Sequence, residues 1–207
     1  MDFELKSLSP EQSVDLAVDA LLVLVPDNLP KAQGKALTAL SELIEDAAQR
    51  GDLETGVGKC LSCYRPAGLK AARVVLARVG DGSPAAVRKA VVAAMSSLKA
   101  PQVRKLGLLL NLLADSDATV QAAMTGCADA SYVYTHSKPS AKARPLHKVV
   151  VGVGKAEAVR TGFQQGKGLV AGVELPAAAP LRTRARRPWP APAVHPAFRS
   201  GQSGHRP

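Results

Sequence analysis

Two cysteines at a CxxC spacing, Cys60-Leu-Ser-Cys63, are the first residues in this sequence whose type and spacing suggest chemistry. Such a pair supports thiol–disulfide exchange when its first cysteine begins a helix, because the helix dipole stabilises the thiolate. It supports zinc binding only with two further ligands, and no second CxxC or histidine pair follows. The surrounding residues read as a strand, which places side chains three positions apart on opposite faces. We therefore expect two ordinary reduced thiols.

The tetrapeptide Gly-Val-Gly-Lys occurs twice, at 56–59 and at 152–155, and a glycine-rich turn before a helix can hold a phosphate. The phosphate-loop pattern needs glycine at position 149 and serine or threonine at position 156, where this chain has Val149 and Ala156. The dinucleotide pattern needs glycine at position 157, which is Glu157. The first copy also lacks the hydroxyl residue. We interpret both copies as turns.

His136 and His147 flank a polar loop at 138–145, and no serine or cysteine nucleophile sits in a GxSxG elbow. A histidine by itself is usually a surface residue or a hydrogen-bonded core residue, so neither receives a catalytic role. The sequence therefore yields no catalytic, cofactor-binding or metal-binding residue.

The net charge of +10 is concentrated at the carboxyl end of the chain. Residues 1–175 contain 21 lysines and arginines against 17 acids, a net charge of +4, and residues 176–207 contain six arginines and no acid. Several of these arginines lie near a tryptophan: Arg182, Arg184, Arg186, Arg187 and Trp189. They could clamp phosphates and stack a nucleic-acid base, and the alternative is an unselected, solvated tail. Seven prolines and the loss of aliphatic periodicity predict that 176–207 is disordered.

The composition indicates a cytoplasmic, reduced protein without membrane contact. Hydrophobic residues make up 46% of the chain and aromatic residues 3%, so valine, leucine and alanine must build the core. The first residues, MDFELKSLSPEQ, lack the basic and apolar regions of a signal peptide, and no apolar run approaches 18 residues. Three cysteines provide no disulfide framework.

Strand-like and helix-like patterns alternate along the chain, and the apolar run Ala20–Val25 is typical of a strand buried on both faces. We predict strands at 3–8, 20–25, 60–64, 73–79, 103–110 and 146–151, and helices from Pro30 to about Gly51, at 85–98 and at 118–131. Ser83-Pro84 and Asp117 are expected to begin the last two helices. Because parallel strands need crossovers of this kind, residues 1–153 are predicted to form a three-layer α/β sandwich with a mostly parallel central sheet.

The segment 155–175 is predicted to form one more helix. Its apolar stripe consists of Ala156, Val159, Phe163, Val170 and Val173. It also contains Gly162, Gly166, Gly168 and Gly172. Each glycine costs on the order of 0.8–1 kcal/mol in a free helix, so these glycines require another backbone packed closely against the helix. No downstream segment supplies that partner.

The stretch ARVVLARVGDGSPAAVRKAVVAAMSSLKAPQVRKLGLLL resembles the amino-terminal domain of bacterial leucyl aminopeptidases, the cytosol aminopeptidase family. Three further stretches are similar to the same domain in the same order: LPKAQGKALTALSELIEDAAQRGDLETGVGK, SYVYTHSKPSAKARPLHKVVV and AVRTGFQQGKGLVAGVEL. The last, at 154–175 with its flanks, is similar to the helix that connects this domain to the catalytic domain. The resemblance covers about 1–175 and implies a macro-domain-like fold.

The resemblance also implies a homo-hexameric metallo-exopeptidase that releases the N-terminal residue of a peptide. Two divalent metals, manganese or zinc, would be held by Asp, Glu and Lys side chains of the carboxy-terminal domain. Motifs such as NTDAEGRL are absent here, and beyond Asp129 only Glu157 and Glu174 are acidic. No metal or catalytic residue can therefore be carried over, and peptides would be bound only through the missing domain. We hypothesise a truncated or frameshifted product that departs from the family at Pro176.

Three functions remain open. The chain is a non-catalytic aminopeptidase domain, or a DNA-binding module that uses its basic surface and the arginine-rich tail. The resemblance supports the second function too, because some bacterial members of the family bind DNA. The third is a small-ligand domain whose loops at 80–83 or 152–155 follow the carboxyl ends of strands.

Overall fold

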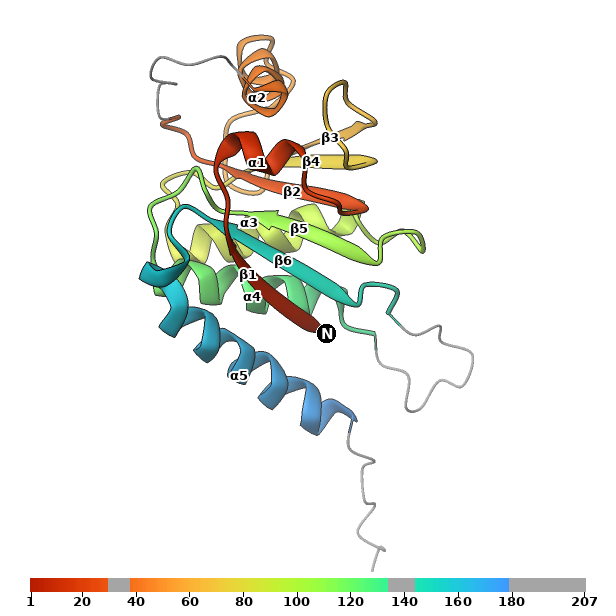
Figure 1. Ribbon diagram of the computed structural model, residues 1–207, viewed down its shortest axis with the longest axis vertical. Coiled ribbons are helices and arrows are strands. Elements are labelled where there is room, and N and C mark those ends of the chain that lie inside the picture. Colours follow the sequence, from red (N-terminus) through yellow and green to blue (C-terminus); the bar gives the residue numbers. More distant parts are fainter. Residues whose placement is uncertain (30–37, 134–143, 179–207) are drawn as a thin grey trace, which may run out of the picture.

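A six-stranded sheet forms the centre of the molecule in a computed structural model that describes residues 1–29, 38–133 and 144–178 (Figure 1). Its strands are β1 (Asp2–Ser7), β2 (Ala20–Val25), β3 (Cys60–Tyr64), β4 (Arg73–Arg78), β5 (Lys105–Leu109) and β6 (Lys148–Val153). They lie in the order β1-β6-β5-β2-β4-β3, and every neighbouring pair is parallel except β3 with β4. The predicted mostly parallel sheet is confirmed.

The central strand β2 is buried along its whole length, as its continuous apolar sequence predicts. Successive side chains of a strand point to opposite faces, so β2 supplies both halves of the core. One set of alternate residues, Ala20, Leu22 and Leu24, belongs to one hydrophobic cluster. The other set, Leu21, Val23 and Val25, belongs to a second cluster. A sheet with a core on each face needs a helical layer on each side.

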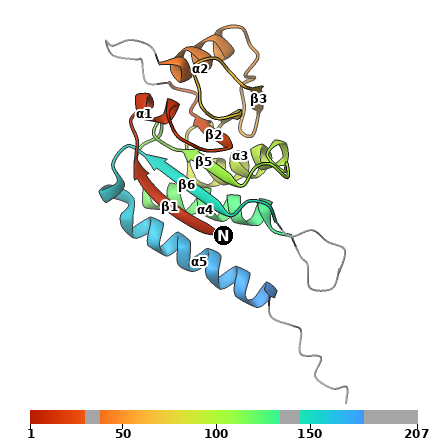
Figure 2. The ribbon, with the colours of Figure 1, turned by 45° about the vertical axis from the view of Figure 1, so that its right-hand side comes forward.

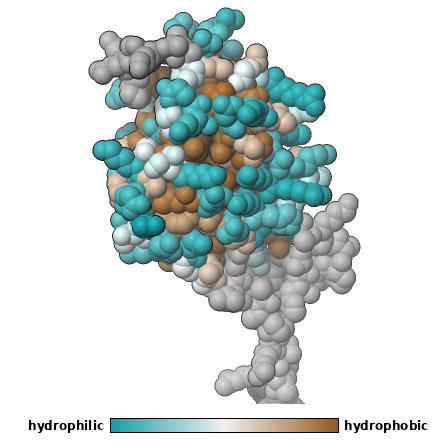
Figure 3. Space-filling view, viewed as in Figure 1, coloured by the Kyte–Doolittle hydropathy of each residue, from teal (hydrophilic) through white to brown (hydrophobic). Residues whose placement is uncertain are grey.

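Two helical layers supply this cover (Figure 2). The helices α3 (Pro84–Ser97), α4 (Asp117–Ser131) and α5 (Arg160–Ala178) lie on one face, and α1 (Pro10–Val14) and α2 (Ala39–Gln49) lie on the other. In the space-filling view, apolar side chains emerge between charged ones over the middle of the domain (Figure 3). The predicted three-layer α/β sandwich is confirmed. Among the described residues, no helix combines the length and hydropathy needed to cross a membrane.

Two of the predicted helix starts differ from the structure, and one helix was missed. The sequence analysis did not predict α1, whose Ser9 and Gln12 form a capping box. Helix α2 begins at Ala39, where the Thr38 hydroxyl accepts the Ser41 N–H, and residues 30–37 lie outside the described residues. Gly51 has φ +78°, as expected of the glycine that follows a helix end.

Asp117 does not cap α4 as predicted, because Ser116 occupies the N-cap position and Asp117 is the first helical residue. Its carboxylate instead accepts a hydrogen bond of 2.8 Å from the backbone N–H of Gly162 in α5. The unpaired N–H groups of a helix start attract a carboxylate whether it belongs to the same segment or to another. Asp117 therefore links α4 to the beginning of α5.

Helix α5 has the close backbone partner that its glycines require, and that partner is α4, upstream in the sequence. A Cβ added at Gly162 would overlap the Cα of Asp117, and one added at Gly166 would lie 2.9 Å from the Met124 sulfur. The sequence analysis expected such a partner but looked for it only downstream of the helix. At Gly168 and Gly172, by contrast, an added Cβ would meet no atom within 4 Å.

The end of α5 also differs from the prediction. The helix continues to Ala178, past Pro176, where the sequence suggested that regular structure stops. Proline supplies no N–H, so the helix passes it with one backbone hydrogen bond fewer. The rest of the predicted disordered tail, 179–207, and most of the loop at 138–145 lie outside the described residues.

Candidate functional site

The CxxC pair lies on β3, at one edge of the sheet, where Cys60 is opposite Ala77 and Cys63 is opposite Val74 of β4. Burial raises the pKa of both thiols, and the nearby Asp52 raises the pKa of Cys63 further. Both thiols therefore ionise less readily than a free cysteine, which makes them weaker nucleophiles. Within residues 1–29, 38–133 and 144–178, no three His, Cys, Asp or Glu side chains are grouped closely enough to hold a metal ion.

The turn at 152–155 follows β6, and its backbone amides point at a carboxylate of the chain itself. Asp115 accepts the N–H of Gly154 at 3.2 Å and the N–H of Lys155 at 2.9 Å. These are the donors that a phosphate would need at a glycine-rich turn. The Asp115 carboxylate already accepts both N–H groups, so they are not free to bind a phosphate. The second Gly-Val-Gly-Lys sequence instead connects the end of β6 to Asp115 in the loop after β5.

The turn at 56–59 is likewise used within the fold. Gly56 and Gly58 have φ of +114° and +90°, values that favour glycine. The Gly58 N–H donates to the Arg78 carbonyl at 2.9 Å, and the Lys59 ammonium pairs with Glu54. This turn starts the β3–β4 hairpin.

A hollow of about 420 Å³ lies at the carboxyl ends of β2, β4 and β5, where open α/β sheets commonly bind ligands. Its lining includes Asn28, Asp81, Ser83, Ser116 and Thr119. The N-termini of α3 and α4 open onto it and favour negative charge. However, hydrogen bonds from Ser83 lower the pKa of Asp81, so this wall of the hollow already carries a carboxylate. A phosphate here would meet like charge, and we assign the loop at 80–83 no anion-binding role.

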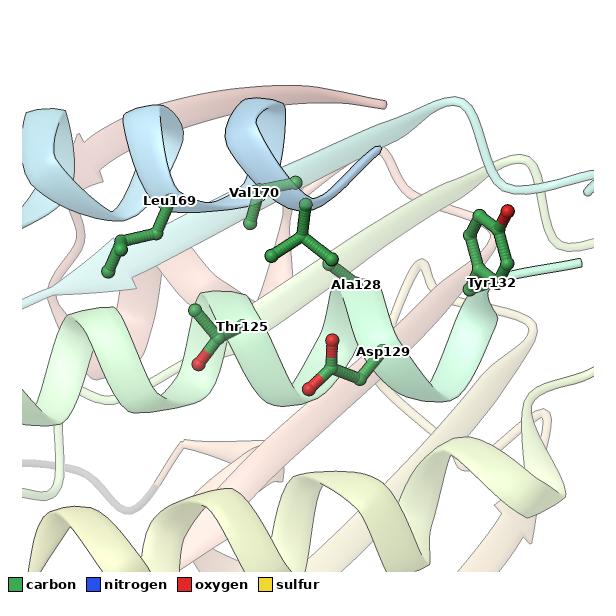
Figure 4. Close-up of a pocket in the computed structure, with 7 residues that line it drawn as sticks. Thr125, Ala128, Asp129, Tyr132, Leu169 and Val170 are labelled. Atoms are coloured by element: carbon green, nitrogen blue, oxygen red, sulfur yellow. The ribbon is translucent and has the colours of Figure 1, made fainter. Parts of the chain in front are cut away.

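A shallow apolar groove lies between α4 and α5 (Figure 4). Seven residues line it: Thr125, Ala128, Asp129 and Tyr132 from α4 and its C-cap, and Leu169, Val170 and Val173 from α5. We call these seven residues the α4–α5 groove. Leu169 is 52% exposed and Val173 is 62% exposed, although both are large and apolar. The sequence analysis placed Val173 on the same apolar stripe as Val159 and Phe163. In the structure Val159 and Phe163 are buried, whereas Val173 is exposed.

An aromatic side chain with two cations marks the β3 edge of the sheet. Tyr64 is 67% exposed, and the guanidinium carbons of Arg65 and Arg73 lie 5.6 Å and 5.8 Å from its ring centroid. His147 is exposed beside β6, and its backbone bonds to Asp2 and Arg104. His136 and the arginine-rich segment at 182–189 lie outside the described residues.

Comparison with known proteins identifies the domain. The profile of the cytosol aminopeptidase family, N-terminal domain, matches residues 20–141. A probable cytosol aminopeptidase of Polaromonas sp. is 42% identical over 176 residues, which is 84% of this chain and 34% of the relative. One from Albidiferax ferrireducens is 38% identical over 175 residues, which is 84% of this chain and 36% of the relative. The chain thus spans about a third of the length of the curated relatives it matches.

Solved structures with little sequence identity share the fold. A tomato leucine aminopeptidase mutant superposes with a TM-score of 0.61 at 17% identity, over 84% of this chain and 37% of that one. The macro domain of ganglioside induced differentiation associated protein 2 superposes with a TM-score of 0.55 at 12% identity, over 82% of this chain and 84% of that one. The fold is therefore macro-domain-like, and the sequence matches are specific to aminopeptidases. The chain belongs to the cytosol aminopeptidase family, of which it carries the N-terminal domain.

Proposed function

We propose that this chain is the non-catalytic N-terminal domain of a leucyl aminopeptidase, a metallo-exopeptidase that releases N-terminal residues from peptides. The observation that carries the proposal is the extent of the match, which takes in 84% of this chain but only 34% of the Polaromonas relative. The catalytic machinery would lie in the unmatched two thirds. As the resemblance implies, the complete enzyme would be a cytoplasmic homo-hexamer that binds peptides through that part.

The carboxylates of this domain support the proposal, because several of them accept hydrogen bonds from backbone amides. Asp19 accepts the N–H groups of Arg104 and Lys105 at 2.9 Å and 2.8 Å. Asp115 and Asp117 serve loops and helix starts in the same way. A site for two divalent ions, manganese or zinc, needs several converging carboxylates, and the donor set described here does not fit one.

Hydrolysis of leucyl-p-nitroanilide by the purified chain, with manganese or zinc added, tests the proposal. We expect no turnover above buffer with either metal. The full-length Polaromonas relative, assayed in parallel, is the positive control and should turn over the substrate. Turnover by this chain that survives repurification and is removed by chelation would overturn the proposal.

DNA binding is a second candidate function, favoured by the Tyr64, Arg65 and Arg73 cluster. An exposed aromatic ring beside two guanidinium groups can stack a base while the cations contact phosphates. The cluster lies on the edge strand β3, so an extended single strand could reach it without displacing part of the fold. Binding through this cluster would weaken steeply as salt rises.

A further inference from the structure

The two sides of α5 differ in a way that the sequence does not show. On the side that faces α4, Val159, Phe163 and Val170 are buried, and Gly166 lets the two helices approach closely. Along the α4–α5 groove and its continuation, Leu169 and Val173 are exposed, and an added Cβ at Gly168 or Gly172 would meet no atom within 4 Å. The continuation consists of Gln121, Gln165, Gly168 and Gly172, together with Leu169 and Val173.

The shape and the apolar lining of the α4–α5 groove suit the binding of an apolar segment. It is a hollow of about 170 Å³, and the apolar side chains of Leu169, Val170 and Val173 form its α5 wall. Figure 4 shows Leu169 reaching from α5 toward α4 above Thr125. At one end, the Gln121 and Gln165 amides are hydrogen-bonded at 2.5 Å and form a polar boundary. Exposed apolar surface with a polar rim is typical of protein contacts, and a groove between two helices suits a third helix.

The one acid in the groove is already neutralised. Asp129 pairs with Arg88 of α3 at 2.6 Å. The Thr125 hydroxyl donates to the Gln121 carbonyl at 2.8 Å, within its own helix. An occupant therefore needs no charged or strongly polar group to match the groove, and an aliphatic surface is sufficient.

We propose that the α4–α5 groove is the docking surface for the polypeptide that follows α5 in full-length aminopeptidases of this family. This inference rests on the proposed function. The chain matches only 34% of the Polaromonas relative, so about two thirds of that relative lies outside the matched region. Helix α5 is the last described element and supplies one wall of the groove, so the polypeptide that follows it in the relative starts beside the groove. A covalently attached segment reaches such a surface at a high effective concentration.

The open glycines fit the same occupant. Gly162 and Gly166 are four residues apart and admit α4 closely, and Gly168 and Gly172 repeat that spacing on the groove side. An element of the following domain could therefore approach α5 there as closely as α4 does on its own side. Among the described residues, none packs against Gly168 or Gly172, and Leu169 and Val173 beside them are exposed.

Co-expression tests the proposal. The present chain, with an affinity tag, is produced together with the untagged carboxy-terminal two thirds of the Polaromonas relative. We expect the two to co-purify in equimolar amounts. The double variant Leu169→Lys/Val173→Lys should reduce the recovered partner at least tenfold, whereas the matched control Val92→Lys should not. Val92 is an exposed apolar residue of α3, 43% exposed, and lies outside the groove.

A second variant separates docking from folding. Gly168→Leu/Gly172→Leu fills the groove side of α5 with bulk and raises helix propensity, so the variant chain should melt at a higher temperature than the original. Its recovery of the partner should nevertheless fall at least tenfold. Equal recovery by the original chain and both groove variants would overturn the proposal, and so would absence of co-purification with the original chain.

Light scattering on the chain alone tests the competing occupant. A stable dimer at 10 µM that the groove variants convert to monomer would assign the groove to a second copy and overturn the proposal. The proposed function fails by a different result, metal-dependent peptidase activity of this chain alone, which does not depend on the groove.

Discussion

The carboxylate of Asp117, the first residue of α4, accepts the backbone N–H of Gly162 in α5 at 2.8 Å. At this point the two helices are so close that a side chain at position 162 would overlap the Asp117 backbone. This hydrogen bond and this glycine help to hold α5 against the sandwich, together with the buried side chains of Val159, Phe163 and Val170. The position of the α4–α5 groove, farther along the same two helices, follows from this contact.

Replacing Asp117 by alanine should destabilise the domain. The variant loses a charge-assisted hydrogen bond and an acid at the start of α4, and together these correspond to about 1.5–3 kcal/mol. Urea unfolding followed by circular dichroism measures the change. The control is Asp52→Ala, at an exposed acid in the loop after α2, which should change the free energy of unfolding by less than about 0.5 kcal/mol. Equal effects from the two variants would contradict the role given to Asp117.

Alanine substitutions at two glycines of α5 should have opposite signs. Gly168→Ala enters open space and should stabilise the chain by up to about 1 kcal/mol through helix propensity. Gly162→Ala places a Cβ against the Asp117 backbone and should destabilise it by about 1–3 kcal/mol. The melting temperatures of both variants are compared with that of the original chain. Helix propensity alone predicts a higher melting temperature for both variants, so a rise for Gly162→Ala would contradict the prediction.

Stability should depend on pH through Glu4, whose carboxylate lies 2.7 Å from the Lys148 ammonium and 3.2 Å from that of Lys6. Hydrogen bonds from Lys148 and then Lys6 lower the pKa of Glu4 below its usual 4.5. A lowered folded-state pKa means that this stabilisation is present above pH 4.5 and is lost as the pH falls through the folded value. The partly exposed site is screened by solvent, so the effect should be small. Urea midpoints of Glu4→Gln and the original chain should converge as the pH falls through the folded-state pKa of Glu4, and divergence on acidification would contradict this.

The three cysteines should differ in reactivity. Cys127 is fully buried, and desolvation raises its pKa to about 12, so it should react with a disulfide reagent only after unfolding. Cys60 is exposed and should react in the folded chain, with a rate that still rises above pH 9 because burial of its sulfur raises its pKa. Titration with Ellman's reagent, with and without guanidinium, gives both results. Rapid labelling of Cys127 in the folded chain would show that α4 opens readily.

If the chain binds DNA through its β3 edge, affinity for single-stranded DNA should fall steeply with salt and should depend on Tyr64. Tyr64→Ala should weaken binding by about 1–3 kcal/mol, as expected for the loss of one stacked base. Fluorescence anisotropy between 50 and 200 mM salt measures both effects. A deletion of 179–207 that abolishes binding while Tyr64→Ala has no effect would assign binding to the tail instead.

Much of this fold could be predicted from local patterns. The run Ala20–Val25 is apolar at every position, which is typical of a strand covered on both faces, and it lies at the centre of the sheet. Alternation of strands with helices predicted a parallel sheet, and the order of similar stretches predicted the family. The short helix α1 was missed because its five residues carry no apolar period, and its capping box is a weak signal within a loop.

The sequence by itself thus determined the α/β class, the mostly parallel sheet and the family, because each is visible in local patterns and in their order along the chain. Only the tertiary structure decided the roles of single residues. It showed that Asp115 fills the turn at 152–155, that Asp117 holds α5, and that Gly162 and Gly166 face α4 while Gly168 and Gly172 face open space. Helical spacing gives the angle between two side chains but not the direction in which a neighbouring helix lies, and that direction is set by long-range packing.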